Sequence, residues 1–486
     1  MDVLRLPQAP AERVNETDAI VVGAGPNGLA AAIYLARAGV RVLVLEASDT
    51  PGGAARSAQV TLPGFVHDLG SAIHPMAAGS PFFRELGLER HGLEWVQPEI
   101  ALAHPLDGGT AAMHRSLEAT AKQLRGDGPA YRRLMQPLVK NWEAVAAEIL
   151  RPMLHLPRHP VALARFGLRG FFPAMSIIRG RFRGEHARAL FAGLAAHSFL
   201  PLSAPGSSAI GLALGMMGHA VGWPFPRGGA QAITDALAAC LREHGGVLQC
   251  NTPVASLADL PPARAILLDV SPWQLLALAG ARLPAGYGRA LERFRHAPGI
   301  FKIDYALDGP VPWRDEACRR AGTIHLGGSA EEIMLCEREI ARGRIPDRPF
   351  VLAAQHSVFD PTRAPEGRHT FWAYCHLPLG SIFDMTSRIE QQIERFAPGF
   401  RERILARHTM GPARLQAWNA NLIGGDISGG ANSLWQLFCR PVPGSAPYRT
   451  PLPGVYLCSA STPPGGGVHG MCGYHAARVA FADVFA

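Results

Sequence analysis

The segment Asp18-Ala-Ile-Val-Val-Gly-Ala-Gly-Pro-Asn-Gly28 decides the fold of this 486-residue chain. Residues 19–22 form a short apolar run typical of a buried strand, and Pro26 suits the first turn of a helix. Residues 40–45 give a second apolar run of the same kind. The three glycines therefore fall in a turn between a strand and a helix, which is the setting that a dinucleotide-binding fingerprint requires.

Each glycine of this turn has its own physical role. Gly23 permits a tight turn, Gly25 lets a diphosphate approach the backbone, and Gly28 lets helix and strand pack closely. The N-terminus of the helix offers N–H groups and partial positive charge to the phosphates. Glu46, at the end of the second strand, would bind the adenosine ribose and repel a 2′-phosphate, so the order of these features predicts FAD and disfavours NADP. The residues predicted to bind the cofactor here are Gly23, Gly25, Pro26, Asn27, Gly28, Glu46, Gly52, Gly53 and Arg56.

Composition narrows the class of protein. The chain is 48% hydrophobic and long enough for two or three domains with full cores. Its eight cysteines form no CxxC pair and show no Cys/His spacing suited to zinc, so we predict neither dithiol chemistry nor a bound metal. The net charge of +8 is spread along the chain without a nucleic-acid-binding motif, which argues against nucleic acid as a partner. No secretory signal is evident, and we expect a cytoplasmic location.

The order of the expected elements indicates an α/β fold in which an FAD-binding Rossmann domain is interleaved with an α+β substrate domain and a helical cap. The cap is expected because apolar residues recur at helical spacing from residue 116 onward. The substrate domain is expected where strand patterns mix with an amphipathic helix. The boundaries that we assign are 1–17 for an N-terminal tail, 18–75, 224–280 and 445–486 for the FAD-binding domain, 76–223 for a helical cap and substrate region, and 281–444 for the substrate domain.

The end of the chain returns to the nucleotide-binding domain. Residues 454–458 form a buried-strand run, followed by the glycine loop Pro464-Gly-Gly-Gly-Val468 and a helix rich in alanine. A glycine loop ahead of a helix directs N–H groups and the positive helix end at the flavin, where they stabilise charge on its reduced pyrimidine ring. We therefore predict that Gly466, Gly467 and Val468 contact the flavin.

These segments, together with Pro226-Arg-Gly-Gly229, resemble the FAD-dependent phytoene dehydrogenase-like oxidoreductases over nearly the whole chain. Within that family the sequence is most similar to the bacterial branch related to pyridine nucleotide-disulphide oxidoreductase domain-containing protein 2. The resemblance implies a glutathione-reductase-type FAD domain, a substrate domain like that of the amine oxidases, and Val254 beside the adenine. Relatives often carry Gly-Ala-Ser-Thr-His-Pro where this chain has Ser459-Ala-Ser-Thr-Pro-Pro464, so no catalytic role is transferred from that histidine.

The sequence leaves three functions open. The first is an oxidoreductase in which flavin N5 exchanges hydride with an apolar substrate, an isoprenoid or lipid, in desaturation, saturation or isomerisation, with an unknown electron acceptor. The second is a flavin amine oxidase. The third is a binding or regulatory protein that kept the fold, against which the intact glycine loops argue. His74 and His469 are the candidate acid-base residues because both lie in segments expected near the flavin, although either could instead fix a loop by hydrogen bonding.

Residues 151–184 have the most unusual charge pattern of the chain. They include seven arginines and no Asp or Glu, interleaved with Phe166, Phe171, Phe172, Ile177, Ile178 and Phe182. Arginines would meet anionic headgroups while apolar side chains enter the acyl boundary, so the pattern predicts peripheral docking on an anionic membrane surface. The alternatives are a solvated helical face whose apolar residues pack inward, or an oligomer interface.

Overall fold

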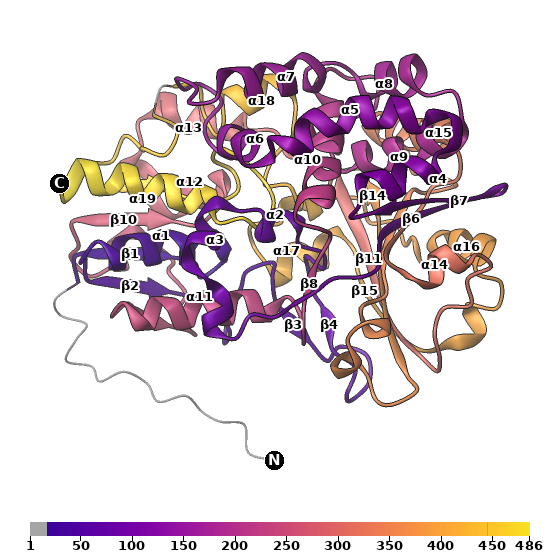
Figure 1. Ribbon diagram of the computed structural model, residues 1–486. Helices are drawn as coiled ribbons and strands as arrows, with labels where there is room; N and C mark the ends of the chain where they lie inside the picture. Colours follow the sequence, from indigo (N-terminus) through magenta and orange to yellow (C-terminus); the bar gives the residue numbers. More distant parts are fainter. Residues whose placement is uncertain (1–16, 445) are drawn as a thin grey trace.

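The computed structural model describes residues 17–444 and 446–486 and is shown in Figure 1. Its two larger β-sheets lie side by side, and a group of helices forms a cap along the upper edge of the view. The α/β class predicted from the sequence is confirmed. The predicted N-terminal tail, residues 1–17, lies outside the described residues apart from Thr17.

The first sheet is parallel and combines short strands from distant parts of the chain. In spatial order its strands are β16 (Val455–Leu457), β10 (Ala265–Leu268), β1 (Ala19–Val22), β2 (Val42–Leu45) and β9 (Val247–Gln249). Central β1 pairs with β10 on one side and β2 on the other. Because the strands run in one direction, their carboxyl ends meet at one edge of the sheet, where a doubly wound fold binds its ligand.

Helices cover both faces of the first sheet. One face packs against α1 (Pro26–Arg37), α11 (Gln231–Glu243) and α19 (Met471–Val484), and the other against α12 (Pro272–Ala279) and α13 (Ala285–Glu292). Helices α1 and α19 pack closely, since a Cβ atom at Gly473 of α19 would lie 1.8 Å from the carbonyl oxygen of Asn27 of α1. The two ends of the chain are therefore joined in one domain.

The second sheet is mostly antiparallel. In spatial order its strands are β15 (Ile404–Met410), β11 (Gly299–Leu307), β14 (His369–Leu377), β13 (Val351–Ala354), β12 (Ala321–Leu326), β6 (Ile100–Leu106) and β7 (Gly109–His114). Strands β6 and β7 fall within residues 76–223, which we predicted as a helical cap and substrate region. Strand β6 is buried on both faces, so its sequence lacks the alternation that marks a half-exposed strand.

The two faces of the second sheet have different neighbours. Phe301, Ile303 and Cys375 belong to a core shared with α14 (Glu316–Arg319) and α16 (Thr386–Phe396). Side chains alternate along a strand, so the intervening residues of β11 and β14 point to the opposite face. There Trp372 and Tyr374 join the core that continues into the cap and the first domain.

The cap consists of seven helices. They are α4 (Leu117–Gln123), α5 (Gly128–Lys140), α6 (Trp142–Ile149), α7 (Pro160–Gly170), α8 (Ala174–Arg181), α9 (Glu185–Ala196) and α10 (Ser207–Ala220). Helix α10 lies at the centre and buries Leu212, Met216 and Met217. A Cβ atom at Gly211 would lie 3.1 Å from the Cα atom of Ala195, so small residues bring α9 and α10 together.

Candidate functional site

The predicted cofactor turn connects the carboxyl end of β1 to α1. Gly23 has a φ of +98°, which favours glycine. A Cβ atom at Gly28 would lie 2.0 Å from the carbonyl oxygen of Gly23, so only glycine fits there. Pro26 occupies the first turn of α1, next to Asn27, and no side chain caps this helix end. The turn therefore presents backbone at a helix N-terminus, as diphosphate binding requires.

Glu46 and the paired glycines lie against this turn. The Glu46 carboxylate accepts hydrogen bonds from the backbone N–H groups of Ala24 (2.7 Å) and Ser48 (2.9 Å). A Cβ atom at Gly53 would lie 3.1 Å from the Cα atom of Gly25, while the N–H of Gly52 donates to the carbonyl of Ala24 at 2.9 Å. The carboxylate that we predicted for the ribose thus lies beside the predicted diphosphate loop.

Arg56 connects the paired glycines to the substrate domain. Its guanidinium donates to the carbonyls of Gly53 (3.1 Å) and Trp418 (3.3 Å) and packs over the indole ring of Trp418 at 4.8 Å. Val254, predicted beside the adenine, is half-buried against the core around α12. It follows a segment in which the N–H of Thr252 donates to the carbonyl of Glu46.

The C-terminal glycine loop reaches the same end of the domain. Gly466 and Gly467 are exposed and Val468 is half-buried just before α19, whose Gly473 packs on the first turn of α1. Buried Arg440 holds the neighbouring loops by donating to the carbonyls of Gly429 (2.8 Å) and Ala460 (3.1 Å).

The residues at these two loops fit FAD. Asn27 Oδ1 and Arg440 Nη1 are buried polar atoms without a hydrogen-bond partner among the described residues. Such groups in native proteins normally find a partner, and here an amide and a cation lie beside two glycine loops at helix N-termini. The turn at Gly25 would bind the diphosphate of a dinucleotide held there, and Glu46 would bind its ribose. The loop at Gly466 would face the flavin.

Asp269 is a charged member of this site that sequence reasoning missed. It follows β10, and its buried carboxylate accepts a hydrogen bond from the N–H of Gly28 at 2.9 Å. A Cβ atom at Gly25 would lie 2.8 Å from the same carboxylate oxygen. Burial raises the pKa of Asp269 to about 7; the Gly28 N–H opposes this rise and the charge of Glu46 adds to it. A proton on Asp269 therefore controls the charge beside the diphosphate loop.

We expect FAD affinity to fall as pH rises through about 7. A diphosphate would raise the pKa of Asp269 further, so binding takes up a proton and weakens once the free protein has lost it, by up to about tenfold per pH unit. Asp269→Asn should remove this slope, because an amide does not titrate in this range. Titration of apoprotein with FAD from pH 6 to 9 measures both proteins, and equal slopes would contradict the prediction.

His74 is buried, and both of its ring nitrogens lack a hydrogen-bond partner among the described residues. Burial lowers its pKa to about 4, against the opposing charge of Asp68. The ring is therefore neutral near pH 7 and can accept or donate one hydrogen bond at each nitrogen. Unpartnered nitrogens keep His74 a candidate for contact with a ligand.

His469 has a structural explanation. Its Nδ1 atom accepts a hydrogen bond from the N–H of Met471 at 3.0 Å, at the start of α19, and its carbonyl accepts from the hydroxyl of Ser80 at 2.7 Å. Burial lowers the pKa of His469 to about 4. These bonds match the loop-fixing alternative that the sequence left open, and a proton-transfer role for His469 stays a prediction.

A buried charged cluster lies between the first domain and the substrate sheet. Asp68, in β4 (His67–Asp68), binds Arg363 Nη2 at 2.5 Å and also accepts from the N–H of Ala230. On β11, Lys302 pairs with Asp304, and its Nζ atom lies 5.9 Å from the ring centroid of Trp372. Burial lowers the pKa of Lys302, although Asp304 opposes that change.

A histidine oriented by a carboxylate lies on the same face of this sheet as Lys302 and Asp304. His376 Nδ1 lies 2.9 Å and 3.1 Å from the two carboxylate oxygens of Glu337, which is buried on α15 (Ala330–Ala341). Its Nε2 atom is buried without a hydrogen-bond partner among the described residues. Phe199 packs over the ring at 4.1 Å between centroids. A carboxylate at Nδ1 fixes the tautomer that leaves Nε2 as the proton acceptor.

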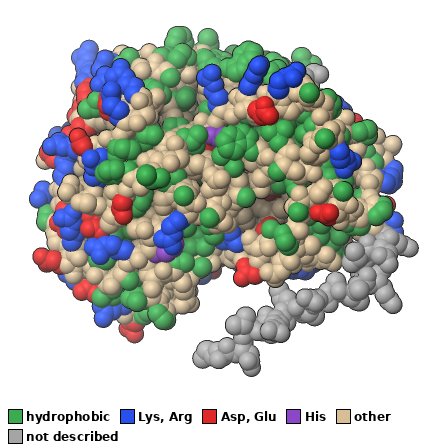
Figure 2. All heavy atoms as spheres, turned by 180° about the vertical axis from the view of Figure 1, so that it is seen from behind, with side chains coloured by type: hydrophobic (Ala, Val, Ile, Leu, Met, Phe, Trp, Pro, Cys, Tyr) green, Lys and Arg blue, Asp and Glu red, His purple; other side chains and the backbone are tan. Residues whose placement is uncertain are grey.

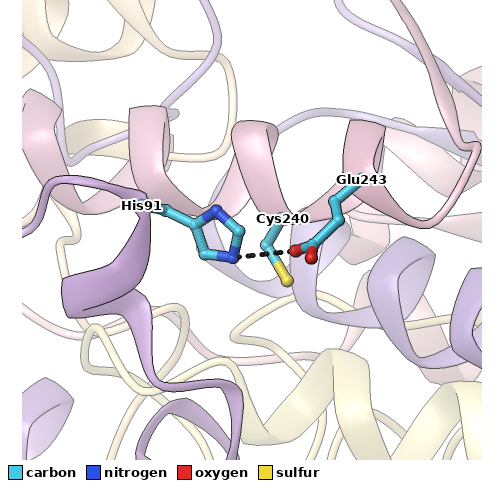
Figure 3. A group of neighbouring side chains, drawn as sticks. All are labelled: His91, Cys240 and Glu243. Carbon is cyan, nitrogen blue, oxygen red and sulfur yellow. Dashed lines mark ion pairs between the residues drawn. The ribbon is translucent and has the colours of Figure 1, made fainter.

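One group with potential metal ligands occurs within the described ranges: His91, Cys240 and Glu243 (Figure 3). His91 ends η2 (Leu88–His91), and its Nε2 atom lies 3.2 Å from a carboxylate oxygen of Glu243 on α11. Burial, and then the charge of Glu243, raise the pKa of the Cys240 thiol. The ion pair accounts for this group, and we assign no metal to it.

The chain is similar to known flavin-dependent proteins. The profile of the family described as flavin containing amine oxidoreductase matches residues 27–371. Pyridine nucleotide-disulfide oxidoreductase domain-containing protein 2 of Rattus norvegicus is 28% identical, over 96% of this chain and 94% of the relative. Hydroxyneurosporene desaturase of Cereibacter sphaeroides is also 28% identical, over 96% of this chain and 97% of the relative.

Solved structures show the same fold. Putrescine oxidase bound to putrescine superposes with a TM-score of 0.60 at 18% identity and covers 96% of this chain and 98% of its own. The predicted amine-oxidase-like architecture and the FAD cofactor are thereby confirmed.

Proposed function

The chain belongs to the flavin containing amine oxidoreductase family and is an FAD-dependent oxidoreductase, and from this premise we propose that it oxidises or reduces C–C bonds of an apolar isoprenoid or lipid. The observation that carries the proposal is the pair His376–Glu337, on a sheet face that also bears Trp372 and Tyr374. Desaturation removes a hydride and a proton from adjacent carbons, and the pair supplies an oriented acceptor for the proton. The desaturase among the relatives supports the same class of reaction.

In this proposal His376 Nε2 accepts the proton. Bound FAD supplies the hydride acceptor at N5. Glu337 holds the Nδ1 proton and stabilises the charge that forms on the ring, so the imidazole stays in one tautomer. Phe199 and Tyr374, whose ring centroids lie 4.1 Å and 5.8 Å from that of His376, keep water away from it. The substrate loses two hydrogens and gains one double bond.

Amine oxidation is the second candidate because putrescine oxidase shares the fold. An amine cage requires aromatic rings that enclose a neutral amine. The nearby Trp372 and Tyr374 rings meet edge to face, at 5.1 Å and 73°, so they do not form two parallel walls. This geometry favours a C–C substrate over a caged amine.

The flavin spectrum under anaerobic conditions tests the proposal. We expect neurosporene-type polyenes in detergent to bleach the flavin absorbance of the wild-type protein, and amines such as putrescine to leave it unchanged. His376→Asn should slow the bleaching by about 10²–10⁴-fold, the range of general base catalysis. His244→Asn, an exposed substitution, is the control. Bleaching by amines alone would overturn the proposed substrate class. An unchanged bleaching rate in His376→Asn would overturn the role of His376 as proton acceptor.

A further inference from the structure

One face of α7 mixes exposed apolar and basic side chains. Val161, Arg165 and Leu168 follow one another at intervals of four and three residues, so they form one stripe along the helix axis, and Phe172 lies two residues beyond the end of the helix. All four are exposed, Val161 to 63%, Leu168 to 72% and Phe172 to 56%. Arg158, one turn before Val161, is exposed as well. A helix face with apolar side chains this exposed normally meets a partner.

Neighbouring segments extend this stripe. Before α7, the side chains of Leu154 and Leu156 are 68% and 92% exposed. Beyond its end, Phe171 stacks on Phe438 of α18 (Leu434–Phe438) with 6.3 Å between ring centroids, and on the same short helix Trp435 is 72% exposed. The α7 patch comprises Leu154, Leu156, Arg158, Val161, Arg165, Leu168, Phe171, Phe172 and Trp435.

The α7 patch lies at an edge of the molecule. Figure 1 shows α7, α8 and α18 along the upper edge of the cap, and in Figure 2 hydrophobic and basic side chains alternate along the upper edge. Ser208 holds the segment on the cap core, since its Oγ atom lies 2.6 Å from the carbonyl oxygen of Arg169 and 2.7 Å from that of Phe172, and its single proton is donated between them. The end of α7 and the turn that follows it are therefore fixed on the cap.

Only some of the apolar side chains of residues 151–184 are exposed. Phe166, Ile177, Ile178 and Phe182 are buried, so for these four the inward-packing alternative holds. Among the described residues no single helix is long and apolar enough to cross a membrane; α7 and α8 pass that test only as a pair bent by 82°. Phe171 and Phe172 of this segment are exposed.

We propose that the α7 patch docks on the surface of an anionic lipid bilayer. Residues 151–184 carry seven arginines and no acidic residue, so the surface that complements them is negative. Leucine, phenylalanine and tryptophan side chains of the α7 patch would enter the headgroup and acyl boundary, while its arginines reach the headgroups. A second copy of this chain offers no such charge match, because it would place arginines opposite arginines in a symmetric contact. The delivery of an apolar substrate from the bilayer to the cap follows only if the proposed function holds; docking itself does not depend on it.

Flotation of the FAD-loaded protein with vesicles tests the proposal. We expect the wild type to float with vesicles that contain phosphatidylglycerol and to stay behind with pure phosphatidylcholine. Arg158→Glu/Arg165→Glu should weaken binding by at least about 30-fold, from roughly 1 kcal/mol for each basic residue near the surface. Leu168→Ser/Phe172→Ser should weaken it by about tenfold or more, because less apolar surface enters the boundary.

Matched controls separate docking from unfolding and from catalysis. Ile382→Ser removes a side chain that is 96% exposed elsewhere on the molecule and should float like the wild type. The patch variants should keep the flavin spectrum of the wild type. Absence of wild-type flotation, equal flotation of the patch variants, or vesicle-independent dimers that the patch substitutions dissociate would each overturn the proposal. None of these results depends on which substrate reduces the flavin.

Discussion

Replacing Gly28 with alanine is expected to yield protein without bound FAD. The new methyl group would lie 2.0 Å from the carbonyl oxygen of Gly23 and 3.2 Å from the carboxylate of Asp269, so it meets backbone on one side and a buried acid on the other. Neither neighbour can move without opening the turn between β1 and α1. Because that turn presents its N–H groups to the diphosphate, its distortion removes the binding site itself.

The measurement is the flavin content of the purified protein, followed by titration with added FAD. Gly286→Ala is the matched control, since no atom lies within 4 Å of a Cβ atom at that position on α13. Alanine there should keep full flavin content and add up to about 1 kcal/mol of helix stability. A yellow Gly28→Ala protein with wild-type flavin content would show that the turn does not bind the dinucleotide as described.

The cofactor turn could be predicted from the sequence because its determinants lie close together in the chain. The apolar run 19–22, Pro26 and the glycines specify strand, turn and helix by local geometry alone. By contrast, the partner of Gly28 is Asp269, 241 residues away. No local pattern predicts that pairing, since it arises only when β10 joins β1 in the sheet.

The pair His376–Glu337 on the substrate sheet is a second feature that the sequence could not predict. His376 and Glu337 are 39 residues apart, and each looks ordinary in its own strand or helix. A weaker signal was present in β11, where Lys302 and Asp304 interrupt an apolar run with the period of a strand. Two charges on one face of a buried strand must find partners, so that alternation could have marked the face as a candidate site.

Among stability changes, we expect the largest for Asp68→Ala. Asp68 and Arg363 are both fully buried, and removal of one partner leaves an uncompensated charge, at a cost of about 3–5 kcal/mol in the free energy of unfolding. The same carboxylate accepts from the N–H of Ala230 and the hydroxyl of Ser57, so these also lose a partner. Arg363 and hydrogen bonds hold the pKa of Asp68 well below its usual range despite burial. The stabilisation is therefore present above the ordinary carboxyl pKa and is lost as pH falls below it.

Denaturation of the holoprotein, followed by tryptophan fluorescence, measures this loss against two controls. Glu85→Gln removes an ion pair with Arg37 whose partners are half exposed, and it should change stability by about 1 kcal/mol or less. Asp68→Leu/Arg363→Met removes both buried charges and should recover much of the loss, because no charge is then left unpaired. If Asp68→Ala behaved like Glu85→Gln, water would have to reach Arg363, and the boundary between the first domain and the substrate sheet would be open. A closed boundary keeps Lys302, Asp304 and His376 at a fixed position relative to the cofactor loops, as hydride and proton transfer from one substrate would require.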